Sequence, residues 1–167
     1  MSFRTIKADE IEGNVVKQIR DQWMLIGAGT EGKANSMIGS WGFMGEMWRK
    51  DVAVCVVRPN RYTYEFMESN ETYALSFLGD EYSEVKKIFG SKSGRDINKV
   101  EGGPLTPAYK HGALYYEEAE LVIFCRKLYV HDYKEEEFLD KALIDDCYGN
   151  GNFHRVYYGE ILEVLAK

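Results

Sequence analysis

Two short basic segments carry the residues best suited to binding a negatively charged ligand. The first runs from Arg58 to Tyr64 (Arg-Pro-Asn-Arg-Tyr-Thr-Tyr), where an apolar stretch ends and a short helical pattern begins. An arginine offers a planar pair of N–H donors that matches a phosphate, and a helix start adds backbone donors and positive partial charge. Arg58, Arg61 and Thr63 therefore predict a phosphate cradle, with a capped helix and solvated arginines as the alternative.

The second basic segment is Ser91–Asp96 (Ser-Lys-Ser-Gly-Arg-Asp), which combines two hydroxyls, two cations and a glycine just after a helical pattern. We expect Gly94 to adopt a left-handed conformation that turns backbone N–H groups toward an anion. A polar surface loop is the alternative interpretation. If the two basic segments meet in space, they predict a single phosphate site on a chain whose net charge is −6.

A third segment, Asn35–Trp41 (Asn-Ser-Met-Ile-Gly-Ser-Trp), mixes small polar residues with a methionine and a tryptophan in an apolar context. Small residues let a flat ligand come close to backbone N–H and C=O groups. A tight β-turn with a packed Trp41 is the alternative. Beside the phosphate site, this segment is a candidate surface for an aromatic ring system.

Gly27, Gly29 and Gly32 spell G-x-G-x-x-G directly after an apolar stretch, as in dinucleotide-binding folds. That motif requires a helix after the third glycine, because the helix N-terminus holds the pyrophosphate. Residues 33–45 contain three more glycines, and each glycine costs about 1 kcal/mol inside a helix. The pattern therefore predicts a hairpin turn and not a dinucleotide site.

The elements that must position these segments are mostly strands. Short runs rich in β-branched and aromatic residues predict strands at 23–28, 53–57, 72–78, 119–130 and 156–165. Gly159 marks a bulge or a close approach in the last strand. Helical patterns cover 64–69 (with Thr63 as N-cap), 81–89 and 135–144, and loop signals are dense at 27–45, 90–103 and 149–152. Strands that outnumber short helices predict a mainly β, antiparallel barrel or sandwich, since a parallel doubly wound sheet needs longer helices.

Composition sets the remaining limits. The 167 residues are 45% hydrophobic and 29% charged, so we expect one domain, 1–167, whose core needs no disulfide or metal. The acidic balance gives no reason to expect a nucleic acid or a membrane as partner. The chain has three widely spaced cysteines, Cys55, Cys125 and Cys147, and this odd number and wide spacing argue against disulfides and a zinc site. Cys55 and Cys125 lie in apolar runs, so we expect them to be inert core residues. No signal-peptide or membrane-span pattern occurs, so we expect a cytoplasmic protein.

In this order, the segments resemble the flavin reductase-like, FMN-binding split-barrel family, and within it the flavoredoxin branch. The most specific piece is the Arg-Pro-x-Arg-Tyr-Thr run that starts at Arg58, and 35–41, 93–96 and the tail 154–161 also match. The resemblance covers nearly the whole chain. It implies an antiparallel Greek-key split β-barrel with a few short helices, which forms a homodimer and holds FMN non-covalently near the subunit interface.

The resemblance also assigns roles by position. The FMN phosphate and ribityl chain would be held by Arg58, Arg61, Thr63, Ser93 and Arg95, with Lys92 added for its charge and Tyr62, Ser91 and Gly94 from the same segments. The isoalloxazine ring would be lined by Asn35, Ser36, Met37, Ile38, Ser40 and Trp41, partly through backbone groups. Ile38 and Ser76 depart from the family, which often has a hydroxyl residue at the first position and an asparagine at the second.

His154 is the candidate catalytic residue, because a histidine near a flavin could stabilise charge on the reduced ring or relay a proton. A surface or strand-start histidine is the alternative. We expect an FMN-binding oxidoreductase that takes electrons from NAD(P)H or a ferredoxin-type donor, and no nicotinamide-specific motif decides between the donors. A non-enzymatic FMN-binding sensor or store is the second hypothesis. A relative of pyridoxamine-phosphate oxidase is a third hypothesis. The lack of a clear second phosphate site in the sequence argues against it.

Overall fold

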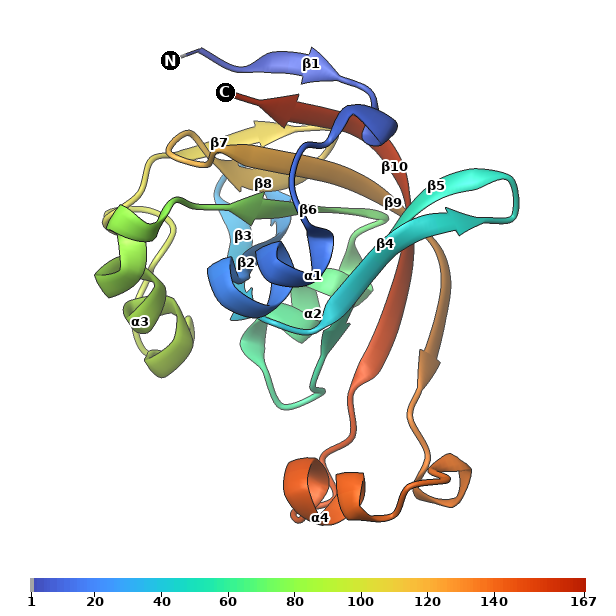
Figure 1. Cartoon of the computed structure of the whole chain (residues 1–167). Coiled ribbons are helices and arrows are strands. Elements are labelled where there is room, and N and C mark those ends of the chain that lie inside the picture. The colour runs from blue at the N-terminus through green and yellow to red at the C-terminus, as the bar shows by residue number, and fades with distance from the viewer. Residues whose placement is uncertain (1) are drawn as a thin grey trace.

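One curved antiparallel sheet forms the body of the protein (Figure 1). The computed structural model describes residues 2–167. The sheet has 8 strands in the order β3-β2-β6-β9-β10-β5-β4, with β1 beside β10, while β7 and β8 pair as a separate hairpin. The strands are β1 (Arg4–Ile6), β2 (Met24–Thr30), β3 (Lys33–Gly39), β4 (Gly42–Met47), β5 (Lys50–Val57), β6 (Thr72–Phe77), β7 (Pro107–Lys110), β8 (Ala113–Tyr116), β9 (Leu121–Asp132) and β10 (Arg155–Ala166). The predicted mainly β, antiparallel fold with few short helices is confirmed.

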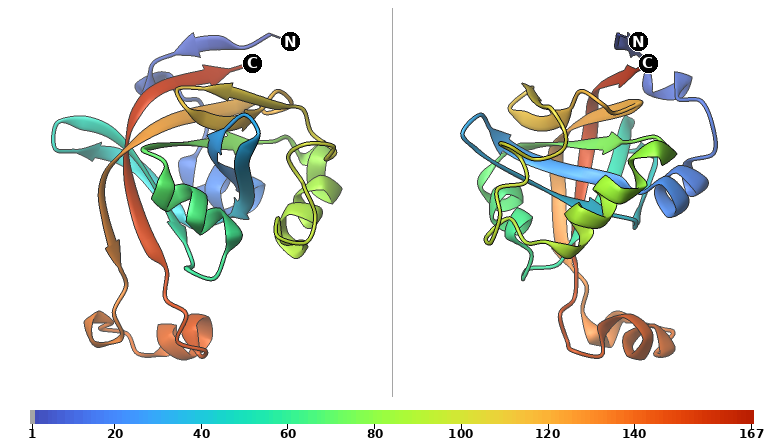
Figure 2. Two further views of the ribbon diagram at one scale, coloured as in Figure 1. Left: turned by 180° about the vertical axis from the view of Figure 1, so that it is seen from behind. Right: turned by 90° about the vertical axis from the view of Figure 1, so that its left-hand side faces the viewer.

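The helices are short and lie around the sheet. They are η1 (Ala8–Glu10), α1 (Val15–Lys17), η2 (Gln18–Gln22), α2 (Tyr62–Ser69), η3 (Asp80–Tyr82), α3 (Ser83–Ser91), η4 (Glu135–Glu137) and α4 (Ala142–Tyr148). Within residues 2–167, none is long and apolar enough to cross a membrane. Strands β9 and β10 continue beyond the body of the sheet and carry an arm, residues 133–154, that ends in η4 and α4 (Figure 2).

The single helix predicted at 135–144 is wrong, because the arm breaks it into η4 and α4. Phe138 leaves the helical path, and its ring packs 5.9 Å from the ring of Tyr133 and 5.7 Å from that of Tyr148. The backbone N–H of Ala142 then donates to the Asp140 side chain (3.1 Å) where α4 begins, after the N-cap residue Lys141. Aromatic packing along the arm thus outweighs local helix propensity.

Two further predictions near the N-terminal half are corrected by long-range pairing. The N-cap of α2 is Arg61, and Thr63 lies inside the helix, where its hydroxyl accepts a hydrogen bond from the Asn35 side chain (2.8 Å). The loop predicted at 27–45 is mostly strand, because its glycines allow close packing: a Cβ on Gly42 would lie 2.2 Å from the Val54 carbonyl oxygen. The glycine motif near residue 30 is the β2–β3 hairpin, as predicted.

The core fills both sides of the sheet with alternating side chains. Tyr73 and Leu75 of β6 belong to the larger cluster, and Ala74 between them belongs to the cluster under β7 and β8. Cys55 and Cys125 are fully buried in the larger cluster, as predicted, and burial raises the pKa of the Cys55 thiol to about 12. This thiol therefore stays protonated and unreactive at neutral pH.

Gly159 marks both a bulge and a close approach in β10, as its position predicts. The register with β9 shifts between Tyr158 and Gly159. A Cβ at Gly159 would lie 2.4 Å from the Tyr73 hydroxyl and 2.7 Å from the Cys125 Cβ. Only glycine allows the two long strands to bend together across the core at this point.

Glu163 on β10 makes the fold sensitive to acid. Thr5, Lys110 and His111 contact its carboxylate at 2.8, 2.7 and 2.6 Å. Burial alone would raise the pKa of Glu163, but these contacts outweigh it and lower the pKa to about 2. The ionised carboxylate therefore stabilises the fold fully above its ordinary pKa near 4.5, and this stabilisation is lost as the pH falls through about 2.

We expect Glu163→Gln to lower the free energy of unfolding at pH 7 by about 2 kcal/mol, measured by urea denaturation. The difference from the unmodified protein should disappear near pH 2. Glu84→Gln is the control, because that exposed glutamate pairs with Lys87 on its own helix. An equal loss at pH 2 and pH 7 would show that the ionic contacts of Glu163 are not its source.

Candidate functional site

The two basic segments meet at one cavity, although 26 residues, 65–90, separate them in the sequence. Residues 60–63, at the start of α2, face residues 90–96, at the end of α3 and in the loop after it. The cavity has a volume of about 280 Å³. We call it the polar cavity, and its lining residues are Asn35, Met37, Ile38, Asn60, Arg61, Tyr62, Thr63, Phe89, Gly90, Ser91, Lys92, Ser93, Gly94, Asp96 and Lys99.

Lys99 is a buried cation at the polar cavity, only 4% exposed. Its ammonium donates to the carbonyls of Lys92 (2.7 Å) and Phe89 (3.4 Å), neither of which carries a charge. Burial lowers the pKa of Lys99, and the nearby Arg61 guanidinium lowers it further. An ammonium has three N–H donors, so one is left for a ligand, and a buried cation gains most from a ligand that is an anion.

Asn35 and Thr63 connect strand β3 to helix α2 beneath the cavity. Both are buried, and the Asn35 amide donates to the Thr63 hydroxyl (2.8 Å). The pairing fixes the first turn of α2 beside the sheet. Residues 58–61 join β5 to this turn, and its backbone N–H groups and Arg61 are presented at the same edge of the cavity.

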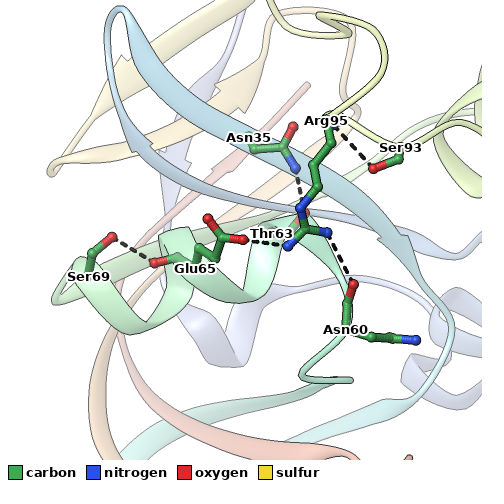
Figure 3. Close-up of polar contacts among 7 residues, drawn as sticks. All are labelled: Asn35, Asn60, Thr63, Glu65, Ser69, Ser93 and Arg95. Atoms are coloured by element: carbon green, nitrogen blue, oxygen red, sulfur yellow. Dashed lines mark hydrogen bonds and ion pairs between the residues drawn. The ribbon is translucent and has the colours of Figure 1, made fainter.

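Arg95 does not line the polar cavity and instead ties its two walls together from outside (Figure 3). Its guanidinium pairs with Glu65, donates to the Asn60 carbonyl (3.2 Å) and lies 4.9 Å from the centre of the Tyr62 ring. Its backbone N–H donates to the Ser93 hydroxyl (3.2 Å). Arg95 thereby fastens the loop after α3 to the start of α2.

Gly94 is required for close packing, and the predicted left-handed conformation is wrong. Its φ lies outside the positive range. A Cβ there would lie 2.2 Å from Asn35 Oδ1 and 2.9 Å from Tyr62 Cδ1. The loop can therefore approach β3 and α2 only because residue 94 has no side chain.

A second, smaller cavity of about 160 Å³ adjoins the first, because Met37, Ile38 and Arg61 line both. It has a more apolar character and contains the indole of Trp41. We call it the Trp41 cavity, and its lining residues are Met37, Ile38, Gly39, Ser40, Trp41, Val56, Arg58, Arg61 and His154. The two cavities together offer a cationic, polar end and an end where apolar side chains and an indole lie beside Arg58 and His154.

His154 lies at the Trp41 cavity, with its ring centre 5.1 Å from that of Trp41. Its Nδ1 is hydrogen-bonded to the Tyr148 hydroxyl (2.7 Å), so a partner exists that the sequence did not reveal. Burial, followed by the positive charges of Arg58 and Arg61, lowers the pKa of His154 to about 4. Burial also raises the pKa of Tyr148 to about 12, so both side chains are neutral at pH 7.

Arg58 belongs to the Trp41 cavity and not to the polar cavity where the phosphate cradle was expected. One of its N–H groups donates to the Cys147 carbonyl (2.8 Å), and its guanidinium lies 5.1 Å from the centre of the Tyr148 ring. Arg58 therefore anchors the arm to the body of the protein beside His154.

All of the candidate residues line one of the two cavities except Ser36 and Arg95. Ser36 points to the opposite side of β3, fully buried, with its hydroxyl 2.6 Å from that of Tyr116. Sequence reasoning missed the following lining residues: Gly39, Val56, Asn60, Phe89, Gly90, Asp96 and Lys99. Asn60 and Asp96 lie inside the two basic segments and were within reach of that reasoning.

Comparison with solved structures shows the same fold in several proteins of low sequence identity. A flavoredoxin from Methanosarcina acetivorans is 21% identical, with a TM-score of 0.68 over 87% of this chain and 68% of that one. An FMN-binding protein from Thermus thermophilus, solved with bound 1-cyclohex-2-enone, is 18% identical, with a TM-score of 0.69 over 98% of this chain and 80% of that one. Flavoredoxin of Desulfovibrio vulgaris (Miyazaki F) is 19% identical, with a TM-score of 0.65 over 87% and 69%.

Comparison with curated proteins finds no match. The family model for the flavin reductase like domain, in contrast, matches residues 16–167. This match covers all of the elements that build the two cavities, from η2 to β10. The protein therefore belongs to the family of flavin reductase-like domains.

Proposed function

We propose that this protein binds FMN non-covalently and acts as a flavin reductase- or flavoredoxin-type oxidoreductase, with NAD(P)H or a ferredoxin-type protein as electron donor. The observation that carries the proposal is the junction of the two cavities through Met37, Ile38 and Arg61. A ligand with an anionic tail and a flat ring that is polar at its edge matches a cationic cavity joined to one of mixed polarity that contains an indole.

The polar cavity fits the FMN phosphate. A phosphate monoester carries close to two negative charges at neutral pH, and Arg61, Lys92 and Lys99 supply three positive ones. Asp96 opposes part of that charge. The Thr63 and Ser93 hydroxyls and the first turn of α2 add neutral donors. The single phosphate of FMN matches the three cations that line this one cavity, which favours FMN over a flavin that carries a diphosphate.

The Trp41 cavity fits the isoalloxazine ring. Bound flavin would supply the redox chemistry, and the protein positions it and sets its electrostatic surroundings. Met37, Ile38 and Trp41 exclude water from the ring, and the positive charges of Arg58 and Arg61 favour added negative charge on it. His154, neutral and oriented by Tyr148, can offer one ring N–H as a donor.

Visible absorbance tests this proposal directly. The purified protein, or the apoprotein after addition of micromolar FMN, should be yellow and should release flavin on denaturation. Anaerobic addition of NADH, NADPH or reduced ferredoxin should then bleach the bound flavin. A protein that takes up no FMN contradicts the proposal, and bound FMN that no donor reduces indicates the sensor or storage role instead.

Gly94→Ala should weaken FMN binding about tenfold, because the added Cβ must displace Asn35 and with it the bond to Thr63. The measurement is fluorescence titration of the apoprotein with FMN. Gly45→Ala is the matched control, since a Cβ there meets nothing within 4 Å. Equal affinities of the two variants for FMN would contradict the placement of FMN in the polar cavity.

We also propose a homodimer, formed through the outer face of β4, β5, β9 and β10. We call this surface the aromatic face. Trp48 and Tyr129 on it are 53% and 51% exposed, and both pack against Tyr158, with ring centres 5.8 and 5.6 Å away. Exposed apolar side chains clustered over a buried valine layer favour burial against a second surface.

Light scattering of the purified protein tests the homodimer, with twice the mass of one chain expected. Tyr129→Glu should shift the equilibrium toward the monomer, because it places a charge within the aromatic face. Leu139→Glu, on the exposed arm, is the control. A monomer at all concentrations would contradict the dimer.

The cytoplasmic location and the single domain over 1–167 stay predictions.

A further inference from the structure

A third hollow lies on the far side of Trp41, between the N-terminal helices and the start of β4. Its volume is about 460 Å³, within the range of about 300–1,000 Å³ that small-molecule pockets occupy. We call it the Val16 groove. Its walls are Val15, Val16 and Ile19 on one side and Trp41, Phe43 and Met44 on the other.

The Val16 groove continues the candidate flavin site, because Ser40 and Trp41 line both the groove and the Trp41 cavity. A ligand in the groove would thus contact the same indole that we place beside the isoalloxazine ring. Only the width of this side chain then separates the two ligands. Electrons cross such a distance readily, so the groove is placed to hold an electron acceptor.

The surface of the groove is apolar and exposed. Val16 and Trp41 are 65% and 44% exposed, and a bound apolar ligand would remove this apolar surface from water. Among residues 2–167, the one charged residue that lines the groove is Arg20, whose guanidinium is held by Asp21 at 2.8 and 3.1 Å. The groove therefore offers aromatic and aliphatic contacts and no free charge to pair with an ionic ligand.

The wall on the helix side is irregular. Residues 18–22 form the π-helical turn η2, and Trp23 follows it with φ of +61°, in a region that non-glycine residues rarely adopt. π-Helical turns and strained backbone concentrate at functional sites. This irregular turn places Ile19 and Arg20 at the groove and lets the chain turn directly into β2.

We propose that the Val16 groove binds an uncharged, flat ring compound of the quinone class as the electron acceptor. This inference rests on the proposed function for its electron source. Reduction of the quinone to the hydroquinone takes two electrons and two protons. Reduced flavin supplies the electrons, and solvent, to which the groove is open, supplies the protons.

The test uses 2-methyl-1,4-naphthoquinone as the probe and methyl NMR of the full chain as the readout, with and without FMN. We expect shifts of the Val16 and Ile19 methyl signals in both forms. The negatively charged 1,4-naphthoquinone-2-sulfonate should bind about tenfold more weakly, because Arg20 in the groove is paired with Asp21 and the net charge of −6 repels an anion.

Val16→Glu should weaken probe binding about tenfold, because it places a carboxylate against the ring. Leu139→Glu, 99% exposed on the arm, should bind the probe like the unmodified chain. Absent methyl shifts, or equal affinities for the two quinones, would overturn the proposal. So would a dimer that Val16→Glu alone dissociates, because the groove would then be an interface between two copies.

Uptake of FMN, read from its visible absorbance, separates this proposal from the proposed function. If FMN does not bind while the probe still shifts the groove methyls, the proposed function fails and the acceptor role falls with it. If FMN binds and is reduced while the probe leaves those methyls unmoved, the proposed function holds and the groove is not the acceptor site.

Discussion

Lys99→Met is expected to lower the affinity for FMN by about ten- to a hundredfold, the range for losing one charge-assisted hydrogen bond to a phosphate. The reason is that Lys99 brings a buried positive charge to the polar cavity, where its described partners are two backbone carbonyls and the Phe89 ring, all uncharged. The affinity is measured by fluorescence titration of the apoprotein with FMN. Methionine keeps the length and apolar packing of the side chain, so the core beside Phe89 stays filled.

The stability of the apoprotein distinguishes a ligand role for Lys99 from a structural one. Burying a cation without a counter-ion is unfavourable, so Lys99→Met should melt at the same temperature as the unmodified protein or higher when no FMN is present. With saturating FMN, the order should reverse, because the stabilisation by ligand scales with its affinity. Lys87→Met is the control, since that exposed lysine pairs only with Glu84.

An unchanged affinity in Lys99→Met would contradict the placement of the phosphate in the polar cavity. Arg61→Ala gives an independent check, because Arg61 lines both cavities. It should weaken FMN binding at least as much as Arg58→Ala, whose guanidinium is engaged by the Cys147 carbonyl and lies at the other cavity. The reverse order would place the phosphate beside Arg58.

The fold could be predicted where the sequence pattern reports directly on burial. The runs at 53–57 and 72–78 correspond to strands β5 and β6. Their β-branched and aromatic residues favour a buried strand. Strands β3 and β4 escaped prediction because their glycines look like loop signals. Their role becomes visible only when a neighbouring strand is present, as Gly42 against Val54 shows.

The candidate site was predictable where one local segment holds the relevant groups, and less so where burial or a distant partner decides. Arg61 and Lys92 lie in recognisable basic segments and do meet at one cavity. Lys99 follows no motif, and its importance comes from burial by elements far along the chain. Arg95 sits in a motif but is engaged by Glu65, 30 residues away, so the side chain turns from the cavity.

His154 is expected to titrate in the apoprotein with a pKa of about 4, well below its ordinary 6.5. Burial is the main cause, followed by the positive charges of Arg58 and Arg61. The NMR chemical shifts of the imidazole protons, followed from pH 3 to 8, measure this value. Because the folded pKa is lowered, the neutral ring stabilises the fold above pH 6.5, and that contribution is lost as the pH falls toward 4.

The same titration shows what His154 can do beside a flavin. Arg58→Gln should move the pKa of His154 up toward 6.5, whereas Arg20→Gln, at an exposed arginine held by Asp21, should leave it in place. Bound FMN should also raise it, because the phosphate offsets the charge of Arg61. A histidine that already titrates near 6.5 in the apoprotein would instead be partly protonated, and so partly charged, at neutral pH. Its role would then be electrostatic stabilisation of the reduced ring, and not hydrogen bonding as a neutral donor.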